Sequence, residues 1–206
     1  MKKVRVRGIM NEKEKVLRQI SNALVEKVEL FSQQDDLFSL YPPLKDDALV
    51  VFAQNVSSLG AKFIYCQDEK EMIEKLYSLI EYRQWQNDIY AFGEKLTNFL
   101  TPYSIPLNKE DENIEKNLVG ISLCQGITTE GIVVLALNEE KNKEEVSFLP
   151  QIFIIIVFSS QITQDISSIL EQFSSNMPKY INTIDVQKIL NGEIKEMYFF
   201  AIEDKM

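Results

Sequence analysis

The 206-residue sequence contains no histidine, and this absence excludes whole classes of site. Without histidine the chain cannot build a Ser-His-Asp triad, a Cys-His pair, an HExxH zinc site or a histidine-ligated haem or iron centre. Its two cysteines, Cys66 and Cys124, are too few for a cysteine-rich zinc or iron–sulfur site within one chain. We therefore expect no metal and no cofactor, and we expect both cysteines to be reduced.

Positive charge is also scarce. Lys and Arg total 22 against 31 Asp and Glu, which gives a formal net charge of -9 at pH 7. The only basic cluster, Lys2, Lys3, Arg5 and Arg7, lies at the N-terminus, and we interpret it as a solubilising arm. A protein that neutralises nucleic-acid phosphates needs a positive face, so we expect no nucleic-acid partner.

Long apolar runs are missing as well. The longest strongly apolar run spans only Ile152–Phe158, far short of the ~20 residues that cross a bilayer. Residues 1–15 contain no apolar stretch of signal-peptide length. We expect a cytoplasmic protein that has no membrane partner.

The N-terminal part predicts helices. Apolar residues recur at helical spacing from Val16 to Val28, and the segment 31–45, which contains two adjacent prolines, is typical of a connection. Asp46 is expected to cap a second helix that buries Leu49, Phe52, Ala53 and Val56 and ends at Gly60. We divide the chain into an N-terminal helix with its connecting segment (1–45) and an α/β domain (46–206).

The α/β domain alternates between strand-like and helix-like stretches, which is typical of βαβ units on a parallel sheet. The run 151–158 is apolar on both alternating sets of positions, which indicates a central strand buried on both faces. The other expected strands are 61–66, 88–92, 118–123, 132–137 and 197–202. The expected helices follow Asp68, whose partner Glu71 suggests a capping box, and cover 93–100, 162–173 and 185–190.

Several motifs in the C-terminal half occur in one order at workable spacings. They are Val119-Gly120-Ile121-Ser122-Leu123-Cys124, Ile127-Thr128-Thr129-Glu130-Gly131 through Leu135, Phe148-Leu149-Pro150, Ser160-Gln161-Ile162 with Asp165-Ile166, and Thr183-x-Asp185-Val186. This pattern resembles the LUD family, the lactate-utilisation protein C group. The resemblance implies a three-layer α/β sandwich similar to the NagB/RpiA/CoA-transferase-like fold. It also implies an accessory role in oxidising L-lactate to pyruvate, beside companion proteins of which one carries an iron–sulfur cluster.

The chain departs from the family pattern at positions suited to anions and protons. Lys179-Tyr180-Ile181-Asn182 stands where the family has Gly-Pro-Ser, and Lys143-Glu144-Glu145 replaces arginines. Phe153 and the turn Gly192-Glu193-Ile194-Lys195 replace two histidines, and the Thr-Gly of the central loop reads Glu130-Gly131. These are the groups best suited to holding an anion or moving a proton, so we expect this copy to be inactive where its relatives are active.

Two segments contain the candidate site residues. In the expected loop 125–131, the polar groups of Gly126, Thr128, Thr129 and Gly131 can receive a carboxylate or phosphate. Thr183 and Asp185 precede an expected helix start, where they can contact an anion. The alternatives are an ordinary glycine-containing connection in the first segment and helix capping in the second.

Glu130 is a candidate base or carboxylate nucleophile, and the alternative is a solvated carboxylate. Cys124 is expected to be a buried, unreactive side chain, because no cation adjoins it in sequence. We expect any site to lie where 124–131 meets Thr183 and Asp185. The leading function is the accessory role, with binding of companion proteins or a small anionic metabolite. The alternatives are a sugar-phosphate or CoA-type binding protein or enzyme of the NagB/RpiA/CoA-transferase-like group, and a small-ligand sensor.

Overall fold

The computed structural model describes residues 12–26, 47–86, 88–108, 118–137, 149–164, 166–174 and 177–204. The basic N-terminal cluster, the connecting segment 31–45, the charged stretches 109–117 and 138–148 and Asp165 lie outside the described residues. The elements, in chain order, are α1 (Glu12–Glu26), α2 (Ala48–Ser58), β1 (Lys62–Cys66), α3 (Glu69–Arg83), β2 (Ile89–Ala91), α4 (Glu94–Leu100), η2 (Thr101–Tyr103), β3 (Val119–Leu123), β4 (Gly126–Thr128), β5 (Ile132–Leu137), β6 (Ile152–Phe158), η5 (Ser159–Gln161), β7 (Ile162–Thr163), α6 (Ile166–Glu171), β8 (Tyr180–Asp185), η6 (Val186–Lys188) and β9 (Glu196–Ile202).

A five-stranded sheet with the order β1-β9-β6-β3-β2 forms the centre of the molecule, and all of its neighbouring strands are parallel. The strand β6 lies in the middle, where residues Ile152 to Val157 are buried. The prediction of a central strand at 151–158 is therefore confirmed. The chain's last strand, β9, is inserted between β6 and β1, so its register depends on strands distant in sequence.

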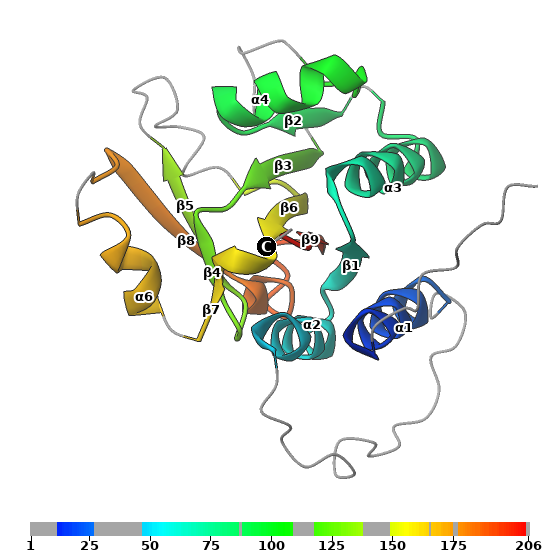
Figure 1. Cartoon of the computed structure of the whole chain (residues 1–206). Helices are drawn as coiled ribbons and strands as arrows, with labels where there is room; N and C mark the ends of the chain where they lie inside the picture. The colour runs from blue at the N-terminus through cyan, green and yellow to red at the C-terminus, as the bar shows by residue number, and fades with distance from the viewer. Residues whose placement is uncertain are drawn as a thin grey trace, which may run out of the picture.

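Apolar side chains cover both faces of this sheet, and the result is a three-layer α/β sandwich (Figure 1). On one face α3 and α4 bury Met72, Leu76 and Leu96 against alternate residues of the sheet. On the other face α1, α2 and a second sheet enclose a core that includes Phe52 and Phe199, whose rings meet edge to face at 5.1 Å. The expected fold class is confirmed.

Local sequence determines several helix ends. The expected cap of α2 is wrong by one residue, because the side chain of Asp47 accepts from the backbone N–H of Leu49. The predicted inward positions, Leu49 and Phe52 among them, are buried. Gly60 follows this helix with a φ of +90°, a conformation that favours glycine, as expected.

The second sheet has the order β7-β4-β5-β8 and was only partly predicted. The expected loop 124–131 contains the strand β4, and the expected helix 162–173 begins only at Ile166, because Ile162 belongs to β7. The expected helix 185–190 is wrong: β8 runs to Asp185, and only a short 3-10 turn follows. The strands β4 and β7 are too short to show an alternating pattern, and β8 buries only Ile184. Among the described residues, none of the helices is long and apolar enough to cross a membrane.

Candidate functional site

Gly126 lies buried in β4 beneath α6. A Cβ built at this position would come within 2.8 Å of Cγ2 of Ile169. Real Cβ atoms do not approach this closely, so the packing of α6 on the second sheet accounts for the glycine. The position thus has a structural use that requires no ligand.

The polar groups of the β4–β5 turn hydrogen-bond largely within the fold. The hydroxyl of Thr128 accepts from the N–H of Ile132 at 3.1 Å, and the N–H of Gly131 donates to the carbonyl of Thr128 at 2.9 Å. The N–H of Thr129 donates to the carbonyl of Thr163 at 2.8 Å. These contacts match the alternative of an ordinary glycine-containing connection in which threonines cap local amides.

The structure brings the two predicted segments together. The N–H of Val186 donates to the carbonyl of Gly131 at 3.2 Å. Thr183 is exposed on β8, and Glu130 is exposed at the turn. Asp185 accepts from the N–H of Gln187 at 2.8 Å, which is the capping contact. Ligand binding by these residues stays a prediction.

The cysteines are buried and free. Burial raises the pKa of the Cys66 thiol and of the Cys124 thiol to about 12. A thiol with such a pKa is protonated at neutral pH and is a poor nucleophile. The expectation of a buried, free side chain at Cys124 is confirmed.

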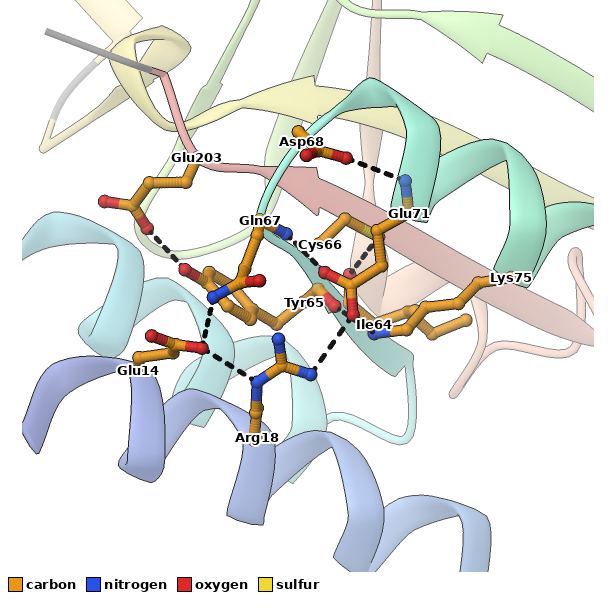
Figure 2. A network of polar contacts seen from close by, with 10 residues as sticks. All are labelled: Glu14, Arg18, Ile64, Tyr65, Cys66, Gln67, Asp68, Glu71, Lys75 and Glu203. Atoms are coloured by element: carbon orange, nitrogen blue, oxygen red, sulfur yellow. Dashed lines mark hydrogen bonds and ion pairs between the residues drawn. The ribbon is translucent and has the colours of Figure 1, made fainter. Parts of the chain in front are cut away.

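Sequence reasoning missed a polar network at the carboxyl ends of β1 and β9. Figure 2 shows most of it, between α1, the end of β1 and the first turns of α3. We define the carboxyl-end network as Lys13, Glu14, Arg18, Asp47, Tyr65, Gln67, Glu71, Lys75 and Glu203. In open α/β sheets this edge is where ligands gather, which makes the network a candidate site by position.

Glu71 is the centre of one half of the network. Its carboxylate accepts from the N–H of Gln67 at 2.7 Å, from Nη1 of Arg18 at 3.1 Å and from Nζ of Lys75 at 3.2 Å. Burial alone would raise the pKa of Glu71, but the Gln67 amide and the two cations outweigh it and lower the pKa. The cap by Asp68 is confirmed, because its Oδ1 accepts from the N–H of Glu71 at 2.8 Å.

Glu203 is the centre of the other half. Lys13 Nζ lies 2.8 Å from Oε1 of Glu203 and 2.6 Å from Oδ2 of Asp47. The hydroxyl of Tyr65 donates to Oε2 of Glu203 at 3.0 Å. Burial, and then the neighbouring Glu203 carboxylate, raise the pKa of Tyr65. Each cation of the network thus lies against a carboxylate, and the arrangement holds charged groups of α1, α3 and the strand ends together.

The Ser-Gln motif forms a second polar connection at the same edge. Oε1 of Gln161 accepts from the N–H of Phe158 at 2.8 Å, and its Nε2 donates to the carbonyl of Cys124 at 3.0 Å. Asp204 accepts from the N–H of Ser160 at 2.8 Å and donates its own N–H to the hydroxyl of Ser159 at 3.0 Å. These bonds join the carboxyl ends of β3, β6 and β9.

The fold and this edge define an α/β sandwich domain with a polar carboxyl end. A family model for the LUD domain matches residues 49–196, and the chain belongs to the LUD-domain family. At the level of the family, this membership associates the chain with lactate utilisation.

A solved structure shares the fold. The crystal structure of a DUF162 family protein from Deinococcus radiodurans superposes with a TM-score of 0.59 over 78% of this chain and 99% of that chain, at 12% sequence identity. At this identity the similarity shows the fold alone. No curated protein matches the sequence.

Proposed function

We propose that the protein is an accessory component of L-lactate oxidation that acts by binding companion proteins, one of which carries an iron–sulfur cluster. The observation that carries the proposal is the match to the LUD domain over residues 49–196. The sequence motifs around Gly120, Gln161 and Thr183 resemble the pattern of the same family. The division of labour among the companions comes from that resemblance.

The chemistry of the described polar groups supports binding over catalysis. The cations of the carboxyl-end network are paired with carboxylates, and both thiols are buried and protonated at neutral pH. Several amides of the β4–β5 turn bond within the fold. A net charge of -9 also favours association with a surface rich in Lys and Arg.

Reconstitution with purified companion proteins tests this proposal. The chain should bind the iron–sulfur companion in size-exclusion chromatography with light scattering, and it should increase the rate at which L-lactate reduces an electron-accepting dye. Because complementary charge contributes, raising the salt concentration should weaken the complex. The proposal fails if the chain neither binds a companion nor changes the rate.

A small anion is the second ligand that we propose, at the junction of 124–131 with Thr183 and Asp185. The supporting observation is that this junction forms, with Gly131 bonded to Val186. With L-lactate and pyruvate as probes, Thr183→Val should weaken binding and keep the melting temperature within a few degrees. Glu130→Gln should also change the affinity for the anion, and because it removes a negative charge the affinity can rise.

The control is Glu81→Gln, which makes the same charge change at an exposed position on α3, across the large sheet. Hydrogen exchange should show that the ligand protects 124–131 and 183–185. Protection of α1 alone, with both segments unaffected, would exclude the junction as the site.

A further inference from the structure

The helix α1 lies outside the matched LUD range and packs on the carboxyl side of the domain. It ends at Glu26, whereas the family match begins at residue 49. Figure 1 shows it beside α2 and β1. Of its described side chains only Leu17 is fully buried, and that side chain joins the core between the two sheets. The helix thus lies outside the matched range and covers the edge where α/β domains bind ligands.

The other described contacts of α1 are mainly ionic, with the cations on α1 and carboxylates on the domain. Lys13 contacts Asp47 and Glu203, and Arg18 contacts Glu71. The side chains of Lys13 and Arg18 are 27% and 29% exposed and those of Glu203 and Glu71 are 31% and 23% exposed, so water reaches the ion pairs and competing cations reach the carboxylates. Ion pairs of this kind are weak individually and exchange readily. Among the described side chains of α1, the surface beneath the helix therefore buries Leu17 and part of Ile20, and three carboxylates border it.

We propose that α1 is an intramolecular competitor, which occupies a docking surface that a basic amphipathic helix of a companion protein uses. This inference rests on the proposed function, because it states how a companion binds. The fitting helix has an apolar residue with one cation four residues before it and another directly after it, as Leu17 has Lys13 and Arg18. Residues 27–46 tether α1 to the domain, which keeps its local concentration near the surface high. A companion helix displaces α1 only if its own concentration and affinity together outweigh those of the tethered helix. Without a companion, α1 therefore stays on the surface.

A peptide exchange experiment on the full chain tests the inference. The probe is a fluorescein-labelled peptide of residues 10–28 with its native sequence, and its binding is followed by anisotropy. In Arg18→Glu the chain's own helix places a carboxylate opposite Glu71, whereas the peptide still presents arginine. We expect this variant to bind the peptide at least about tenfold more tightly than the native chain does. Lys15→Glu makes the same charge change at an exposed position of α1 and should behave like the native chain.

Two results would overturn the inference. One is equal peptide affinity for Arg18→Glu and the native chain, and the other is loss of cooperative melting in Arg18→Glu, because α1 would then be integral to the fold. A labelled peptide that carries Arg18→Glu itself should bind neither protein. Companion binding is measured on the same preparations. If the native chain binds a companion but no exchange occurs, only this inference falls; if neither protein binds a companion, the proposed function falls.

Discussion

Replacement of Glu196 tests the electrostatics at the opposite, amino-terminal end of β1 and β9. Its carboxylate accepts from Lys62, from Arg83 and from the hydroxyl of Tyr198, which lies 2.6 Å away. The Arg83 guanidinium also lies over the ring of Trp85, 5.0 Å from its centroid. Burial alone would raise the pKa of Glu196, but these donors outweigh it and hold the pKa at about 2.

The magnitude follows from the difference between this pKa and the ordinary value of 4.5. Because the folded-state pKa is depressed, the stabilisation is complete above pH 4.5 and is lost as the pH falls towards 2. Taken at face value, the difference corresponds to about 3 kcal/mol. The side chains of Lys62 and Arg83 are 34% and 31% exposed, so solvent screening reduces the contribution to about 1–2 kcal/mol.

Urea unfolding of Glu196→Gln at pH 7 and pH 3 measures this contribution. We expect a loss of about 1–2 kcal/mol in the free energy of unfolding at pH 7, and less than half of that loss at pH 3. The control is Glu193→Gln, which removes an exposed ion pair with Lys188 and should cost at most about 0.5 kcal/mol. The reasoning is refuted if the two variants are equally stable at pH 7, or if the loss at Glu196 is the same at both pH values.

Three further predictions concern packing, domain integrity and the thiols. Gly120→Ala places a Cβ 2.5 Å from a ring carbon of Phe92, so we expect a loss of about 1–3 kcal/mol in urea unfolding, and an unchanged midpoint would contradict this. The fragment 108–206 lacks the partner strands of β9 and β3, so it should show no cooperative melting, and a cooperatively melting monomer would indicate two domains. Cys66 and Cys124 should react with a thiol reagent slowly in the native protein and rapidly in denaturant; fast native labelling would show that they are accessible.

The large sheet could be predicted because its signals are local. The run Ile152–Phe158 is apolar at every position, and this marks a strand buried on both faces. The inward positions of α2 and the cap of α3 at Asp68 also follow from short-range spacing. The second sheet gives weaker signals, because β4 and β7 are very short and β8 pairs with β5 across many intervening residues. The strands β7 and β8 pair with β4 and β5 across separations that no short sequence window contains.

The carboxyl-end network was missed for the same reason. Arg18 meets Glu71 across 53 residues of sequence, and Lys13 meets Glu203 across 190. Acidic residues just after two strands were visible in the sequence, but two of their cations, Lys13 and Arg18, lie on α1, much earlier in the chain. The threonines and glycines of 125–131 were visible too, yet only the hydrogen bonds show that the turn itself uses several of their polar groups.

The proposed function, support of L-lactate oxidation, can be tested in cells. The most direct measurement is the rate of L-lactate-dependent pyruvate formation by cells that lack the gene, compared with the same cells carrying it again. We predict that deletion strongly reduces this rate and that the native gene restores it. An unchanged rate in the deletion strain, with all companion proteins present at their normal levels, would contradict the proposed function.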